Sequence, residues 1–527
     1  MNNQDINYQL EQLIKIGVSL SSEMNTDLLL EMILAGAKQI SNADGGTLYR
    51  IYGNAIKMEI VHSDSLGIKF GGSSGIPVNM PDIPLYLEDG SPNLTNVVSC
   101  SIHSNKTINI ADAYNDKSFD FSGTKAFDLK NSYHSKSFLA VPMKNHEGDI
   151  IGILQLINCI DKFDQSVTRF DAISQHITEA LASQAATVLT KQHLIADLEN
   201  LFESIVELVA TAIDNKSPVT GGHCRRVPDL TMMIAEAAHN THEGYLRDFV
   251  MTDADRYELK IAGWLHDCGK ITTPEFVLDK ATKLETVIDR IKLIETRFEV
   301  LKRDQEIALL KQQLHAAKTG AEVADDVEQA YLAAIAQINA DLDFIRQANT
   351  GGEFMSPDDQ ERVNAFRQKT WCLQGEELPL LSDDEIYNLN IAKGTLNAEE
   401  RAIINHHIVA TIAMLDKITF PKHLQRVPEY AGGHHEKMDG SGYPKGLRRE
   451  QMSIQARTMA IADIFEALTA KDRPYKTGKK LSEALAILKK MKETNHIDPD
   501  LYDAFIKQKI YKRYAEQFLD AYQNDVD

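Results

Sequence analysis

The chain has 527 residues, 43% of them hydrophobic, which is enough for two or three domains with buried cores. A formal net charge of −20 excludes a nucleic-acid polymer as the expected partner, because proteins that follow a phosphate backbone present a basic surface. No apolar run is long enough for a membrane span, and the first residues lack a secretory signal. Five widely spaced cysteines without a CxxC pair indicate reduced thiols, so we expect a cytoplasmic protein.

The first 170 residues combine helical and strand patterns. Apolar residues at helical spacing over residues 10–40 precede short β-rich runs bounded by turn residues, namely "GGTLYRIYG", "AIKMEIVHS", "TINIADAY", "SFLAVPMKN" and "IIGILQLIN". This order resembles a GAF domain over residues 8–190. The resemblance implies an α/β sensory domain, with an unknown small molecule as its ligand.

Residues 171–215 contain neither glycine nor proline and carry an apolar stripe over many turns. The pattern predicts one long helix that must pack against a partner, because an isolated helix is marginally stable. We interpret it as a signalling helix that pairs with a second subunit in a homodimer. The alternative is a connector packed on its own domain.

The remaining part, residues 204–527, is dominated by helical patterns and predicts an all-α domain. Within it, residues 286–390 hold two long amphipathic patterns, "ETRFEVLKRDQEIALLKQQLHAAK" and "VEQAYLAAIAQINADLDFIRQ". They predict an inserted antiparallel helical hairpin. We find no residues with evident chemistry in this insertion.

Histidines and aspartates recur in short motifs through the helical half. "AGWLHDCGK" places His266 and Asp267 after an apolar run, where a buried carboxylate needs a partner such as a metal ion. "TMAIADIFEALTA" predicts that Asp463 points inward, with Glu466 as the exposed acid of the same helix. Imidazole and carboxylate ligands without thiolates suit iron, manganese or zinc, and several of them together suggest more than one metal.

Lys270 lies four residues after His266, so a continuous helix would place both on one face. There the ammonium group would neutralise a phosphate oxygen. The alternative is a salt bridge between Lys270 and a local carboxylate.

Taken together, the ordered motifs are specific. The stretches "SPVTGGHCRRV", "LHDCGKITTPEFVLDK", "GTLNAEERAIINHH", "GHHEKMDGSGYPKGL" and "AIADIFEALTAKDRPYK" resemble, in this order, an HD-GYP domain, a branch of the HD metal-dependent phosphohydrolases. The resemblance covers about residues 204–480, interrupted by the insertion. It implies a metal-dependent phosphodiesterase that hydrolyses cyclic di-GMP to pGpG and onward to GMP, regulated by the GAF domain.

The resemblance also assigns roles to individual residues by motif match. The implied metal ligands are His223, His266, Asp267, His407, His434, His435 and Asp463. His266, Asp267 and Lys270 are the implied catalytic residues. The implied substrate-binding residues are Lys270, Arg473, Lys476 and the loop residues Gly442, Tyr443 and Pro444.

Several alternatives stay open. Some three-metal members carry an acid four residues before the first histidine, where this chain has Val219, so two metal ions, iron or manganese, are favoured over three. Either His406 or His407 can be the third histidine of the set. The substrate can be a related cyclic dinucleotide such as cyclic GMP-AMP, or the domain can be a dinucleotide-sensing module with little activity.

Overall fold

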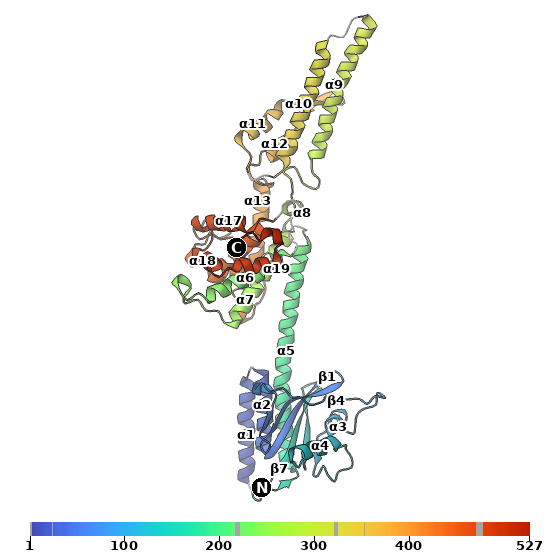
Figure 1. The fold of residues 1–527 in the computed structure, drawn as a ribbon, viewed down its shortest axis with the longest axis vertical. Coiled ribbons are helices and arrows are strands. Elements are labelled where there is room, and N and C mark those ends of the chain that lie inside the picture. The colour runs from blue at the N-terminus through green and yellow to red at the C-terminus, as the bar shows by residue number, and fades with distance from the viewer. Residues whose placement is uncertain are drawn as a thin grey trace. The chain divides into compact units, whose positions relative to one another are not determined.

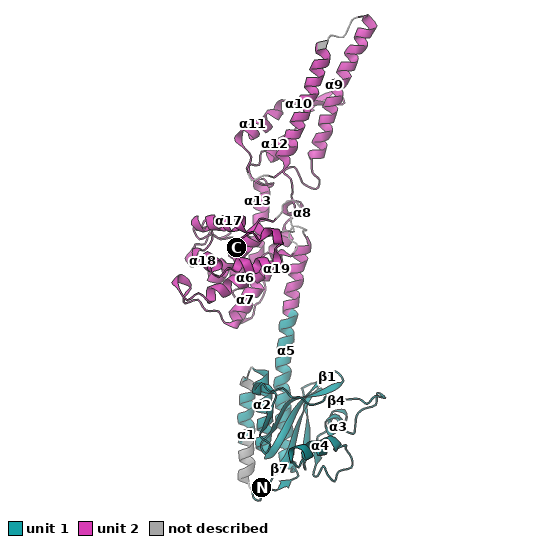
Figure 2. Cartoon of the chain, viewed as in Figure 1, with its two compact units in different colours: residues 1–201 teal, residues 202–527 magenta. Residues whose placement is uncertain are grey.

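The computed structural model describes residues 3–23, 25–216, 222–320, 325–351, 354–470 and 478–526. The chain divides into two compact units, residues 1–201 and residues 202–527, which Figure 2 colours separately. Each unit has hydrophobic cores of its own. Within the described ranges, no helix is long and apolar enough to cross a membrane.

The first unit is built on one antiparallel sheet with the strand order β3-β2-β1-β7-β6-β5, to which β4 adds beside β2 and β8 beside β7. The strands are β1 (Ala43–Tyr52), β2 (Ala55–Ser63), β3 (Ile68–Phe70), β4 (Ile83–Pro84), β5 (Ile108–Ile110), β6 (Phe138–Lys144), β7 (Ile150–Ile160) and β8 (Val167–Thr168). The helices are α1 (Asn3–Ser22), α2 (Thr26–Ser41), α3 (Val97–Ser104), α4 (Ser122–Asn131) and the first part of α5 (Ala172–Lys216).

Side chains of the central strands alternate between the two faces of this sheet. On β6, Leu139 and Val141 join the core that contains the apolar residues of α1 and α2, whereas Phe138 and Ala140 join the core of the opposite face. Figure 1 shows α1 and α2 on one face of the sheet and α3 and α4 on the other. The α/β architecture predicted for this part of the chain is confirmed.

The long helix expected from the sequence is present as α5, a single helix of 45 residues. It begins after Asp171, whose carboxylate accepts the backbone N–H of Ser174 at 2.7 Å. Residues of α5 up to Leu201 belong to the first unit, and those from Phe202 belong to the second. The helix is therefore the covalent link between the two units.

The second unit is almost entirely helical. Outside the insertion its helices are α6 (His223–His239), α7 (Asp253–Leu265), α8 (Glu275–Leu278), α13 (Ala398–Asn405), α14 (His407–Leu415), α15 (Val427–Gly432), α16 (Ile454–Thr469), α17 (Leu481–Glu493), α18 (Pro499–Lys507) and α19 (Ile510–Phe518). Two cores surround α6: one joins it to α16 and to the C-terminal helices, and the other joins it to α7, α15 and the end of α5. Helix α6 and its neighbour α16 therefore form the centre of the domain.

The insertion has a core of its own, formed by buried residues between Leu284 and Leu389. Helices α9 (Ile291–Thr319) and α10 (Asp325–Asn349) lie side by side, as predicted (Figure 1). It also contains α11 (Pro357–Ala365), α12 (Asp383–Leu389) and a hairpin of β9 (Thr370–Leu373) and β10 (Glu376–Pro379). The expectation of an all-α half did not include this hairpin, whose turn residues Gln374 and Gly375 both have positive φ.

Candidate metal centre

The predicted metal ligands come from separate helices of the second unit. His223 is the first residue of α6, His266 and Asp267 directly follow α7, His407 begins α14, His434 and His435 follow α15, and Asp463 lies within α16. These side chains form two groups of potential ligands, each with its donor atoms within 4.8 Å of one another. Residues up to 240 positions apart in the chain are thus assembled in one place by the packing of the helices.

The first group consists of His223, His266, Asp267 and Asp463. Nε2 of His223 lies 3.2 Å from Oδ2 of Asp267 and 3.3 Å from Oδ1 of Asp463. Nε2 of His266 lies 3.2 Å from the same Asp267 oxygen and 3.3 Å from Nε2 of His223. Two imidazoles and two carboxylates therefore converge on one point.

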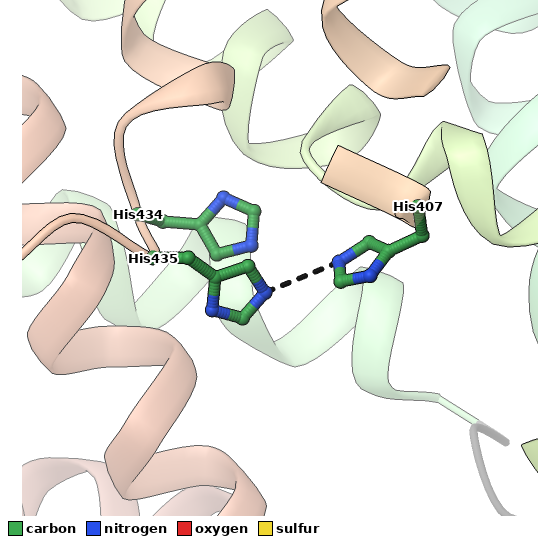
Figure 3. A group of neighbouring side chains, drawn as sticks. All are labelled: His407, His434 and His435. Carbon is green, nitrogen blue, oxygen red and sulfur yellow. Dashed lines mark hydrogen bonds between the residues drawn. The ribbon is translucent and has the colours of Figure 1, made fainter. Parts of the chain in front are cut away.

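The second group consists of His407, His434 and His435, which Figure 3 shows approaching one another from α14 and from the segment after α15. The Nε2 atoms of His407 and His435 are 3.1 Å apart. Asp267 joins the two groups, because its Oδ2 faces His223 while its Oδ1 lies 3.3 Å from Nε2 of His407. One carboxylate thus offers one oxygen to each group.

Three of the imidazoles are oriented by the backbone. Each places Nδ1 near the carbonyl oxygen three residues earlier, at 2.7 Å for His266, 2.5 Å for His407 and 2.6 Å for His434. A ring that donates its Nδ1–H to such a carbonyl has an unprotonated Nε2, which here faces the centre. These orientations suit metal ligation through Nε2.

Two buried acceptor atoms support a cation at this site. Among the described residues, Nε2 of His434 and Oδ1 of Asp267 have no hydrogen-bond partner. Buried polar atoms are rarely left in this state, because an unpaired buried polar group is costly. A divalent cation bound by each group would satisfy these atoms, and the nitrogen and oxygen donors are those that iron, manganese and zinc prefer. The residues present therefore fit a metal centre.

The protonation states of three candidate ligands, His434, His435 and Asp267, agree with ligation. Burial lowers the pKa of His435 to about 4, and burial with the neighbouring imidazoles lowers the pKa of His434 well below its usual range. Burial alone would raise the pKa of Asp267, but Lys270 and His266 hold it well below its usual range. At neutral pH the two histidines are thus neutral and the aspartate is ionised, as metal ligands must be.

Glu466 is a residue whose role the sequence reasoning missed. It was expected to be exposed, but it is only 1% exposed, and its carboxylate accepts hydrogen bonds from Nδ1 of His223 and from Nε of Arg226, the latter at 2.8 Å. Its distance of three residues from Asp463 places both acids on one face of α16, and this spacing was the signal available in the sequence. Burial lowers the pKa of His223, but the carboxylates of Glu466, Asp267 and Asp463 together outweigh burial and raise that pKa well above its usual value. Glu466 therefore orients Nε2 of His223 toward the centre.

Lys270 does not share a continuous helix with His266, so that prediction was wrong. Helix α7 ends at Leu265, and Lys270 lies in a 3-10 helix, Cys268–Thr272. The chain leaves the α-helix because it approaches α14 closely, where a Cβ on Gly269 would collide with the carbonyl oxygen of His407. Nζ of Lys270 lies 2.6 Å from Oδ2 of Asp267, so the alternative prediction, a salt bridge to a local carboxylate, is the one the structure contains.

The loop after His435 is folded onto the centre by Glu436. This buried carboxylate accepts the backbone N–H groups of Lys445 at 2.7 Å and Leu447 at 2.8 Å. The ring of Tyr443 stacks on His435, with 4.9 Å between centroids and 17° between planes. Burial, with the nearby aspartates, raises the pKa of Tyr443 to about 12, so its hydroxyl stays protonated at neutral pH. Tyr443 thus forms a wall of the site, next to Pro444.

The glycines of this loop have different roles. Gly440 and Gly446 have positive φ, 81° and 65°, as turn residues do. Gly442 does not; a Cβ there would collide with the backbone of Glu436 and Lys437. Gly440 and Gly446 are therefore needed for their backbone conformation, whereas Gly442 is needed because no side chain fits there.

The remaining predicted residues divide into two sets. The structure places His407 in the second group, and His406 at the junction of α13 and α14 is not part of it. Val219, Arg473 and Lys476 lie outside the described residues, so their predicted roles stay predictions.

Comparisons with known proteins agree with these two units. A GAF domain model matches residues 25–189, and HD domain models match residues 220–346 and 382–501. The HD domain is a family of metal-binding proteins, in keeping with the two groups of candidate ligands. The fold expected of each part is therefore supported by both the structure and the family models.

Relatives of known function match parts of the chain. A 3'3'-cGAMP-specific phosphodiesterase of Vibrio cholerae is 39% identical over 114 residues, 22% of this chain and 24% of the relative. A cyclic di-GMP phosphodiesterase of Pseudomonas aeruginosa is 48% identical over 75 residues, 14% of this chain and 17% of the relative. A cyclic di-GMP phosphodiesterase of Thermotoga maritima is 33% identical over 134 residues, 25% of this chain and 34% of the relative. The chain thus spans about a third or less of the length of these relatives. It combines a GAF domain with an HD domain that contains two groups of candidate metal ligands.

Proposed function

We propose that this protein is a metal-dependent phosphodiesterase that hydrolyses cyclic di-GMP to pGpG, and onward to GMP. The observation that carries the proposal is the Asp267 carboxylate, which lies between two groups of donors and offers one oxygen to each. This arrangement favours two metal ions, and its nitrogen and oxygen donors suit the iron or manganese that the family resemblance implies. When bound, such ions lower the pKa of a coordinated water and stabilise an in-line displacement at phosphorus.

The side chains of the protein position the ions and the substrate. His223, His266, Asp267 and Asp463 would hold one ion, and His407, His434 and His435, with Asp267, would hold the other. Lys270, which pairs with Asp267 at 2.6 Å, would contact a phosphate oxygen of the substrate when that carboxylate serves as a metal ligand. Tyr443, which stacks on His435, would contact the substrate at the rim of the site. Arg473 and Lys476 remain the proposed additional phosphate ligands.

A second substrate is favoured by a specific observation. Relatives that match 22% of this chain include phosphodiesterases specific for 3'3'-cGAMP, which differs from cyclic di-GMP in one base. The phosphodiester chemistry is the same for both, so the metal centre does not distinguish them. The choice between the substrates depends on contacts to the base.

The test is direct. Full-length protein reconstituted separately with Fe²⁺ or Mn²⁺, under reducing conditions, is incubated with cyclic di-GMP and with 3'3'-cGAMP, and the products are resolved by chromatography. The proposal expects pGpG, followed by GMP, from cyclic di-GMP. Turnover of 3'3'-cGAMP alone would establish the second substrate, and binding without turnover of either would indicate a sensing module.

We also propose a homodimer that pairs through α5. Five apolar side chains of this helix are 51–67% exposed and follow the spacing 4-3-4-3 of a coiled-coil stripe: Leu194, Leu198, Leu201, Ile205 and Leu208. Pairing of two such stripes would bury them. The signal that the GAF domain would send along this helix, the ligand that starts it and the cytoplasmic location remain predictions.

A further inference from the structure

The last turns of α5 pack into the HD domain beside the metal centre. Val206, Ala210 and Ile213 join the core that contains residues of α6 and α7. Beyond this packing, two charged residues of the final turn, Asp214 and Lys216, make polar contacts with the segments that carry the candidate ligands. Sequence reasoning assigned no role to either residue.

Asp214 caps helix α6. The carboxylate accepts the backbone N–H of Gly222 at 3.1 Å and that of Cys224 at 3.2 Å, on either side of His223. The cap position of α6 is Gly222, which has no side chain to satisfy the first N–H groups of the helix. The buried Asp214 carboxylate supplies the missing cap and the negative charge that a helix N-terminus favours. It therefore holds the backbone that carries His223.

Lys216 holds the segment that follows Asp267. The ammonium group donates to three carbonyl oxygens, those of Lys270 at 3.2 Å, Ile271 at 2.5 Å and Thr273 at 2.6 Å. An ammonium group has three N–H donors, so this set of acceptors uses all of them. The three carbonyls lie at the end of the 3-10 helix that contains Lys270, where a cation is favoured. Lys216 thus fixes the turn from which the Lys270 side chain reaches Asp267.

We propose that Asp214 and Lys216 are positioning residues through which the end of α5 sets the separation of His223 from the Asp267–Lys270 turn. This inference rests on the proposed function and adds to it the route by which α5 acts on the site. Asp214 and Lys216 are two residues apart on one rigid helix, so a rotation or shift of α5 displaces both contacts together. A small displacement of reacting groups is costly to catalysis, which makes the end of α5 an effective control point.

The test uses the full-length protein loaded with Mn²⁺. Lys216→Met removes the three donors, and Lys216→Arg retains donors for the same carbonyls. We expect Lys216→Met to lower kcat for the cyclic dinucleotide about tenfold or more with little change in KM, and Lys216→Arg to recover most of the loss. In a Lys270→Met background, Lys216→Met should change kcat by less than about twofold, because its effect acts through Lys270.

A second readout does not depend on turnover. Asp214→Asn should weaken Mn²⁺ binding, measured by titration without substrate, by about tenfold, because the support of His223 is lost. Glu203→Gln is the matched control. It breaks an exposed ion pair between Glu203 of α5 and Lys260 of α7, 3.1 Å apart, and this pair lies away from both contacts. Wild-type values are expected for this control in both assays.

The outcomes separate the two proposals. The inference would be overturned if Lys216→Met lowered kcat equally in the wild-type and Lys270→Met backgrounds. It would also be overturned if Glu203→Gln lowered kcat and Mn²⁺ affinity as much as Lys216→Met and Asp214→Asn do. If the wild-type protein hydrolyses neither dinucleotide, the proposed function fails, and the Mn²⁺ titration of Asp214→Asn alone decides the inference. Unchanged Mn²⁺ affinity in that variant would overturn it.

Discussion

Replacing Glu466 with glutamine tests whether the hydrogen-bond partner of the candidate ligand His223 sets the metal affinity of the site. The carboxylate accepts from both His223 and Arg226, and it is almost fully buried. A glutamine has one acceptor oxygen, so one of these donors loses its partner, and the charge that supports the His223 imidazole is removed. Loss of such a partner costs about 10- to 100-fold in metal affinity, or about 1.4 to 2.7 kcal/mol.

The assay is a Mn²⁺ titration of the metal-free full-length variant, followed by metal analysis after desalting. We expect activity of Glu466→Gln to be low at limiting Mn²⁺ and to recover with excess Mn²⁺, because the ligands themselves are retained. Glu258→Gln is the matched control, since Glu258 is also buried but accepts the backbone N–H of Arg426, at 2.6 Å, and contacts no candidate ligand. Affinity within twofold of the wild type, or an equal loss in the control, would refute the reasoning.

Three further predictions follow from other parts of the chain. Asp267→Asn should reduce bound metal in both groups of ligands, since one carboxylate faces both, and metal analysis that finds the wild-type content would contradict the bridging role. Burial lowers the pKa of Lys283 to about 8, whereas its pKa in the unfolded chain is about 10.5. Between these two pH values the unfolded chain binds more protons than the folded chain, so the free energy of unfolding rises with pH. Lys283→Met should remove this rise and increase stability at pH 7, and urea unfolding that gives parallel pH profiles for variant and wild type would disprove it. Leu201→Asp should weaken the dimer through the α5 stripe, and sedimentation that shows an unchanged dimer at low micromolar concentration would exclude that interface.

Much of the fold was predictable because local patterns agree with the tertiary structure. The run "AIKMEIVHS" coincides with β2, Ala55–Ser63, since its alternation suits a strand with two different faces. The absence of glycine and proline over residues 171–215 predicted α5 almost to its ends. The hairpin of β9 and β10 was missed because two strands of four residues carry too little periodicity to stand out among helical patterns.

The candidate ligands were also predictable as a set, from the order of their motifs, but their grouping was not. The sequence leaves open which histidines share an ion, because the ligands come from α6, α7, α14, α16 and the segment after α15. We predicted that Lys270 shares one face of a continuous helix with His266. This prediction was wrong, because the α-helix ends before Gly269 approaches α14 closely. Such an approach depends on a segment more than a hundred residues away and has no local signal.

The sequence by itself determined which residue types are available, the helices and strands that carry them, and the resemblance that joins them in one family pattern. Only the tertiary structure decided that Asp267 faces both groups, that Glu466 is buried against His223, and that Asp214 and Lys216 support the segments on either side of the centre. The physical reason is that periodicity and propensity act over a few residues, whereas these contacts join side chains to partners on other helices. Their positions are set by how α5, α6, α7 and α16 pack together.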